Sequence, residues 1–196
     1  MTARERDILW EPCADPGLEH LSVRFDPRGL VADGVIIRQR PGTVPFRLWY
    51  RIQCDEATRV RSAQAWIESP EERHVDLRAD GSGNWTDGTG GSIPGLAGCI
   101  DIDIAATPFT NTLPILRLGL APGQNAEIDV VYLTIPELEL RPLRQRYSCL
   151  RTEADRSVYL YQNCVSGFAA ELPVDTDGLV LDYPGQWRRH TGESRP

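Results

Sequence analysis

Short stretches in which polar and apolar residues alternate recur along this chain, separated by turns rich in Gly, Pro, Asp and Asn. Alternation with a period of two is typical of strands with one buried face. Strands spaced roughly ten residues apart, with turn signals between them, indicate an all-β sandwich, roll or barrel. No segment shows a helical stripe of apolar residues. The clearest strand candidates span 18–25, 31–40, 46–54, 60–67, 126–135 and 157–162.

The chain has 196 residues, of which 41% are hydrophobic, so it can bury a substantial core. Because no linker and no shift in composition interrupts it, we expect a single domain over residues 1–196. The polar ends, 1–7 and 189–196, are expected to be frayed.

The formal net charge is −7, and all 21 basic residues are arginine. Nucleic acids and anionic lipids bind basic surfaces, so an acidic chain is not expected to take either as a general partner. No apolar run approaches the length of a membrane span, so we expect no integral membrane segment.

Five scattered cysteines and three histidines form no recognisable metal-binding spacing, and we expect no metal and no cofactor. The stretch 80–84 resembles the start of a calcium loop, but Trp85 stands where such a loop needs glycine. The first residues contain no apolar segment typical of a signal peptide. These features predict a cytoplasmic protein with reduced thiols.

The central stretch Gly98–Gly119 is the first candidate for a binding site. Cys99–Ile104 alternates as a strand, and Ile115–Leu118 is expected to continue as a second strand. The connection between them, 105–114, is uncharged and carries three threonines, an asparagine and a phenylalanine. Such a loop suits a neutral, hydroxylated ligand, although its side chains could equally satisfy the loop's own backbone.

Asp101 and Asp103 lie two residues apart and are expected on one face of a strand. Paired carboxylates can perform acid–base chemistry, or they can form structural ion pairs with arginine across a sheet. No catalytic motif of a known kind occurs, so no catalytic residue is assigned. The predicted ligand-binding set is Asp101, Asp103, Thr107, Phe109, Thr110, Asn111, Arg117, Arg146, Tyr147, Asp182 and Tyr183.

The chain resembles a bacterial family named "putative glycolipid-binding", long classified as a domain of unknown function. The most specific matching piece is Thr107–Pro114, Thr-Pro-Phe-Thr-Asn-Thr-Leu-Pro, which follows Gly98–Asp103. One departure is Thr58, where the family has an aromatic residue. Shorter matching pieces are Trp10 with 17–19, 50–55, 59–61, 77–81 with Trp85, 145–147, 174–175, 177–180 and 182–185.

The resemblance implies an all-β spiral roll, or barrel-like sheet, of many antiparallel strands. It also implies non-enzymatic binding of an amphipathic ligand, such as a glycolipid, in the interior or at the mouth of the roll. The family name rests on a likeness in shape to carriers of lipoproteins and glycolipids, and shape alone does not establish function.

Two other functions stay open at this point. The chain could be an enzyme that acts on a small hydroxylated substrate through Asp101, Asp103 and nearby arginine and tyrosine side chains, or its partner could be another protein. An apolar cavity above about 300 Å³ would favour ligand binding. A small polar cleft holding Asp101, Asp103 and Arg117 would favour chemistry. The large aromatic residues Trp49, Trp66 and Trp85 could simply fill a dry core. The oligomeric state is not predicted.

Overall fold

The computed structural model of the protein describes residues 3–68 and 71–190. Within these ranges the chain is almost entirely β, with two short 3₁₀ turns, η1 (Pro94–Leu96) and η2 (Phe109–Asn111), and one helix, α1 (Thr112–Leu118). The strands are β1 (Arg4–Pro12), β2 (Gly17–Asp26), β3 (Gly29–Arg38), β4 (Phe46–Cys54), β5 (Val60–Ile67), β6 (Arg73–Ala79), β7 (Trp85–Asp87), β8 (Asp101–Ile104), β9 (Asn125–Leu133), β10 (Leu140–Thr152), β11 (Arg156–Asn163), β12 (Ala169–Asp175), β13 (Asp182–Tyr183) and β14 (Trp187–Arg189).

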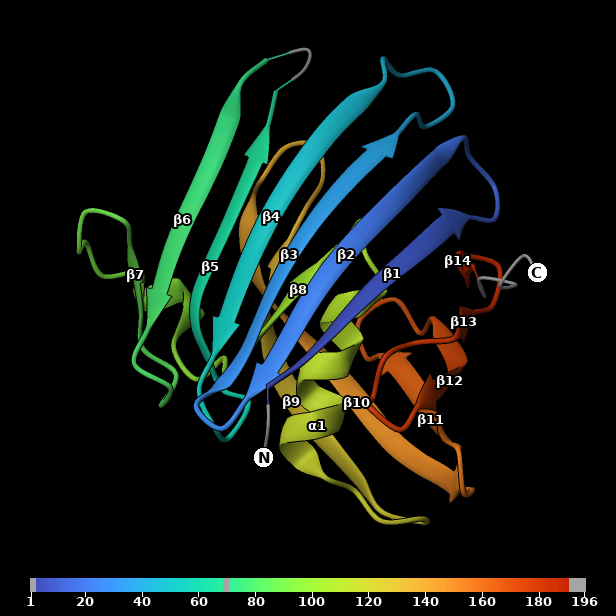
Figure 1. Cartoon of the computed structure of the whole chain (residues 1–196). Helices are drawn as coiled ribbons and strands as arrows, with labels where there is room; N and C mark the ends of the chain where they lie inside the picture. Colours follow the sequence, from blue (N-terminus) through green and yellow to red (C-terminus); the bar gives the residue numbers. More distant parts are fainter. Residues whose placement is uncertain (1–2, 69–70, 191–196) are drawn as a thin grey trace.

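The strands form two sheets on opposite sides of one core (Figure 1). The larger sheet has the order β13-β14-β1-β2-β3-β4-β5-β6-β7, and the smaller has the order β12-β11-β10-β9-β8. From β1 to β6 each strand pairs antiparallel with the next, because short turns join strands that alternate buried and exposed residues. The predicted all-β, single-domain roll is confirmed.

One pairing departs from the antiparallel pattern, since β8 runs parallel to β9. The segment between them includes η2 and α1, and a parallel pair requires such a long crossover connection. This crossover lies between the two sheets, and it carries much of the stretch that the sequence marked as a binding site (Figure 1).

The prediction that Ile115–Leu118 forms a strand is wrong, because these residues belong to α1. Pro114 lies in the first turn of this helix, where the missing amide hydrogen leaves no bond unmade. Gly119 adopts a left-handed conformation and its amide donates to the carbonyl of Ile115 at 3.2 Å, which ends the helix. Four residues of alternating pattern are too few to distinguish a strand from a turn of helix.

The expectation of frayed ends stays a prediction. Residues 4–7 lie within β1 and pair with β2, and Arg189 pairs with Trp10 in the register of β1 and β14. Residues 1–2 and 191–196 lie outside the described residues.

Gly34 shows how one residue type determines the packing of the inner face. It lies opposite Tyr50 in the β3–β4 register, and a Cβ atom built on it would come within 2.2 Å of the Tyr50 ring. Only glycine leaves room for the ring to lie across the strand. The Tyr50 hydroxyl is thereby directed to Glu19 on β2, to which it donates at 2.6 Å.

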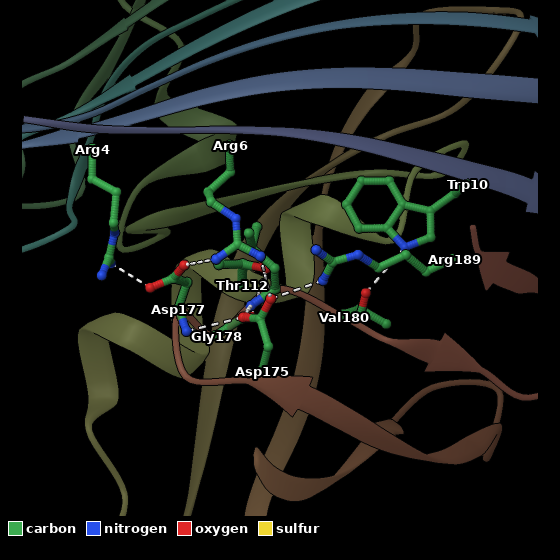
Figure 2. Close-up of polar contacts among 10 residues, drawn as sticks. Arg4, Arg6, Trp10, Thr112, Asp175, Asp177, Gly178, Val180 and Arg189 are labelled. Atoms are coloured by element: carbon green, nitrogen blue, oxygen red, sulfur yellow. Dashed lines mark hydrogen bonds and ion pairs between the residues drawn. The ribbon is translucent and has the colours of Figure 1, made fainter. Parts of the chain in front are cut away.

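The turn between β12 and β13 joins the two sheets by ion pairs, and we name residues 175–180 the latch turn. Figure 2 shows arginines from the larger sheet reaching its two carboxylates. Arg6 donates a hydrogen bond to Oδ2 of Asp177. Arg4 forms an ion pair with Oδ1 of Asp177, but its N–H group is not aligned for a hydrogen bond. Arg189 donates to Asp175 at 2.8 Å. The Asp177 side chain is only 1% exposed, so these contacts are shielded from solvent.

Neutral hydrogen bonds hold the backbone of the same turn (Figure 2). The Trp10 indole donates to the carbonyl of Val180 at 3.0 Å, and the Thr112 hydroxyl donates to the carbonyl of Gly178 at 2.8 Å. Gly178 has a φ of +73°, and a Cβ there would meet the Leu116 side chain at 2.9 Å. The latch turn therefore contacts β1, β14 and α1 at once.

Asp177→Asn is expected to lower the free energy of unfolding by about 2 kcal/mol, because it removes the charged acceptor of a shielded contact. Urea unfolding followed by tryptophan fluorescence measures the loss. The matched control is Asp33→Asn, whose pair with Arg51 is partly exposed and is expected to contribute less than about 1 kcal/mol. Equal losses in the two variants would show that the latch turn has no special role in stability.

Candidate functional site

A polar pocket of about 240 Å³ lies between the smaller sheet and the β13–β14 hairpin. Its wall combines one carboxylate, several amides and hydroxyls, and several aromatic rings. The lining residues are Asp103, Ile104, Ala105, Thr107, Asn111, Tyr132, Tyr161, Asn163, Ser166, Phe168, Tyr183, Gln186 and Trp187. We call this opening the aromatic pocket.

Asp103, at the end of β8, is held by neutral donors. Thr110 donates its hydroxyl to Oδ1 at 3.1 Å, and Gln145 donates its amide to Oδ2 at 2.6 Å. Burial raises the pKa of Asp103, and these two hydrogen bonds oppose the rise. No arginine contacts this carboxylate among the described residues, so its remaining acceptor capacity faces the pocket.

The tyrosine hydroxyls around Asp103 are kept neutral. Burial raises the pKa of Tyr161 and of Tyr183 far above the ordinary value, and the nearby Asp103 charge adds to both shifts. The same two causes raise the pKa of Tyr132. Each phenol can therefore both donate and accept hydrogen bonds at any physiological pH.

A second layer supports the pocket from behind. The Tyr147 hydroxyl donates to Oδ1 of Asn111 at 2.9 Å, and the Asn111 amide donates to the carbonyl of Pro108 at 3.2 Å. The Gln145 amide also donates to the Tyr161 hydroxyl at 3.2 Å. Side chains held in this way present a preorganised set of donors and acceptors, which reduces the entropy lost on binding.

Behind Thr107 lies Glu19, a fully buried carboxyl group on β2. The hydroxyls of Tyr50 and Thr107 both donate to its Oε1 at 2.6 Å, while Oε2 has no partner among the described residues. Burial raises the pKa of Glu19 to about 8, and the two hydrogen bonds only partly offset that effect. Glu19 thus carries a proton at neutral pH.

The structure does not bring the predicted binding residues together in one place. Asp103, Thr107, Asn111 and Tyr183 line the aromatic pocket. Thr110 and Tyr147 are one layer behind, bonded to Asp103 and Asn111. Phe109 is buried beside Tyr50, where it belongs to the core.

Asp101 and Arg117 do not line the pocket. The Arg117 guanidinium donates to both oxygens of Asp101, at 3.0 and 2.6 Å, and the Asp101 side chain has no exposure. The predicted carboxylate pair is thus divided, with Asp101 in a buried ion pair and Asp103 in the pocket wall.

Arg146 and Asp182 also lie outside the lining. Arg146 pairs with Glu127 on the outer face of the smaller sheet, while its neighbours Gln145 and Tyr147 point inward. Asp182 precedes Tyr183, which does line the pocket. Adjacent residues of a strand face opposite sides, so Arg146 faces away from the inner side on which Gln145 and Tyr147 are buried.

Sequence reasoning missed most of the aromatic wall, including Tyr132, Tyr161, Phe168 and Trp187. One feature of the sequence could have indicated this wall. Residues 157–170 carry no charge and contain three aromatic residues, Tyr159, Tyr161 and Phe168. Trp187 faces Tyr183 across the β13–β14 register, but no pattern in a two-residue strand predicts that pairing.

Other features of the described residues give weaker candidates. An open cleft of about 740 Å³ lies beside β6 and β7, lined by Trp66, His74 and Asp87 among others, and Oδ1 of Asp87 accepts hydrogen bonds from Thr89 and Gly91 of its own turn. Asp80 likewise binds Ser82 and Asn84, so the calcium-like loop is a self-contained turn. No cluster of three metal-ligating side chains occurs in residues 3–68 and 71–190.

Trp85 fills the core, whereas Trp49 and Trp66 contact each other at a tilt of 49° on the outer face of the larger sheet, with ring centroids 4.5 Å apart. The dry-core alternative therefore holds for one of the three tryptophans. Among the helices that the structure describes, none is long and apolar enough to span a membrane.

Comparisons with known proteins agree with the architecture. A family model described as "Putative glycolipid-binding" matches residues 7–189. A crystal structure of a DUF1089 family protein from Pseudomonas aeruginosa superposes with a TM-score of 0.79 at 41% sequence identity, covering 88% of this chain and 92% of that one. No curated protein matches the chain.

Glu19→Gln is expected to remove a pH dependence of stability. The folded chain holds a proton on Glu19 between the ordinary pKa of 4.5 and about 8, whereas the unfolded chain releases it. The contribution of this group is therefore fully present below about pH 4.5 and is lost as the pH rises through 8, by about 1.4 kcal/mol per pH unit.

Urea unfolding of both proteins at several pH values between 5 and 8 measures the effect (roughly the interval over which Glu19 titrates). As the pH rises from 5 to 8, the wild type should lose unfolding free energy relative to Glu19→Gln, because only the wild type carries the group that titrates. A difference that stays constant across the interval would mean that the proton on Glu19 is not coupled to folding.

Proposed function

The chain belongs to the family described as "Putative glycolipid-binding", and from this premise we propose that the aromatic pocket binds the sugar head group of a glycolipid without chemical change. The observation that carries the proposal is Asp103, a pocket carboxylate held by neutral donors and surrounded by neutral tyrosines. The cytoplasmic location expected from the sequence stays a prediction.

A sugar ring requires hydrogen bonds around its edge and apolar contact on its faces. The pocket wall offers acceptors and donors from Asp103, Asn111 and Asn163, while Phe168 and Trp187 add aromatic surface. Asp103 is the only charged side chain among the described residues of the lining. A carboxylate without a neighbouring cation repels phosphate and carboxylate groups, so the chemistry favours a neutral hydroxylated ligand.

The size of the pocket limits what it can hold. A volume of about 240 Å³ corresponds to roughly eight water molecules, which is enough for one sugar ring and too little for acyl chains. It lies below the usual range of pockets for larger ligands, about 300–1,000 Å³. The proposal therefore concerns the head group only.

The alternative of an enzyme using two carboxylates has less support. It requires Asp101 and Asp103 in one cleft, and Arg117 occupies both oxygens of Asp101 in a buried ion pair. A single carboxylate with neutral neighbours can accept a hydrogen bond from a hydroxyl group, but it lacks the second titratable group that acid–base hydrolysis of a sugar uses.

Titration with methyl glycosides of glucose, galactose and mannose tests the proposal, with binding followed by calorimetry and by tryptophan fluorescence from Trp187. We expect at least one glycoside to bind, and Asp103→Asn to weaken that binding by roughly tenfold or more, because it removes a charged acceptor.

The matched control is Asp129→Asn, because Asp129 pairs with Arg144 on the exposed face of the smaller sheet. This variant should bind as the wild type does. If none of the glycosides binds, or if the two variants lose affinity equally, the aromatic pocket is not the head-group site.

A further inference from the structure

Two exposed apolar side chains lie beside the mouth of the aromatic pocket. They belong to residues 163–168 between β11 and β12, which we call the tip loop. Val165 is 71% exposed and Phe168 is 39% exposed. Asn163, Ser166 and Phe168 of the same loop line the pocket, so its polar side faces the proposed head group and Val165 faces solvent.

The sequence around the tip loop lacks charge. Residues 157–170 contain no Asp, Glu, Lys or Arg, although 25% of the whole chain is charged. Two arginines of the adjacent strand are paired on the outer face, Arg144 with Asp129 and Arg146 with Glu127, and the Arg141 guanidinium lies over the Tyr132 ring. A surface of this kind has neither the charges that stay in water nor the free cations that bind anionic lipid.

The backbone amides of the tip loop are already hydrogen-bonded within the protein. Oδ1 of Asn163 accepts from the backbone amides of Val165 and Ser166 at 3.0 and 2.9 Å. The backbone carbonyl of Asn163 accepts from the amide of Gly167 at 2.9 Å. Cys164 donates to the carbonyl of Arg144 at 3.0 Å, and Phe168 donates to the Ser166 hydroxyl at 3.3 Å. Satisfied amides remove the largest cost of placing a loop in an apolar layer.

A glycolipid that places one sugar ring in the pocket must leave its acyl chains elsewhere, because the pocket has no room for them. We propose that the tip loop docks on the surface of an uncharged or zwitterionic bilayer, with Val165 and Phe168 in its interfacial region. The head group then enters the pocket while the chains stay in the membrane. This inference rests on the proposed function, and it adds the membrane as the partner.

Co-sedimentation with phosphatidylcholine vesicles, with and without monoglucosyl or monogalactosyl diacylglycerol, tests the docking. The wild type should bind the glycolipid vesicles more tightly than the plain ones. Val165→Asp should weaken binding to both by at least about tenfold, because it places a charge in the interface. It should bind methyl glycosides normally, since Val165 does not line the pocket.

Val44→Asp is the matched control, because Val44 is 55% exposed in the loop between β3 and β4 and also lies outside the pocket lining. Urea unfolding of both variants checks that they are folded. Glycoside binding without vesicle binding, or equal vesicle binding by both variants, would overturn the docking and leave the head-group site standing. Vesicle binding that depends on Val165 in a chain that binds no glycoside would support the docking and overturn the head-group site.

Discussion

The ion pairs of the latch turn connect the two sheets, and the aromatic pocket depends on that connection. One wall of the pocket comes from the smaller sheet and includes Tyr161, while the opposite wall comes from the β13–β14 hairpin and includes Tyr183. The two rings meet with centroids 6.3 Å apart. Because the latch turn leads directly into β13, the contacts of Asp175 and Asp177 with arginines of the larger sheet determine how the hairpin faces the smaller sheet.

Three carboxyl groups of the roll are stabilised in three different ways. The difference distinguishes the carboxyl groups that serve the fold from the one that lines the pocket. Arg117 neutralises Asp101 through a shielded ion pair, so that carboxylate has no capacity left for a ligand. Glu19 avoids the cost of a buried charge by holding a proton. Asp103 has only neutral partners, Thr110 and Gln145, and it reaches the pocket. Of these three carboxyl groups, only Asp103 both lines the pocket and has no cation as a partner among the described residues.

Alternation along the strands made most of the larger sheet predictable, as in β2 to β5, where the buried residues follow a period of two. The same rule, applied more strictly, would have excluded Arg146 once Tyr147 was placed inside. The helix α1 could not be predicted, because a four-residue pattern around Arg117 fits either element. The aromatic wall depends on which strands of two sheets face each other, as with Tyr161 and Tyr183, and such long-range pairing is not encoded in local periodicity.

The sequence associates an amphipathic ligand with an apolar cavity, whereas the aromatic pocket is polar and small. That expectation assumed that one cavity must cover the whole ligand. A lipid supplies its own apolar solvent, because acyl chains left in a bilayer need no cavity in the protein. The protein then needs only a polar site for the ring and an apolar contact with the membrane close to it. Phe168 serves both requirements, since it lines the pocket and is partly exposed on the tip loop.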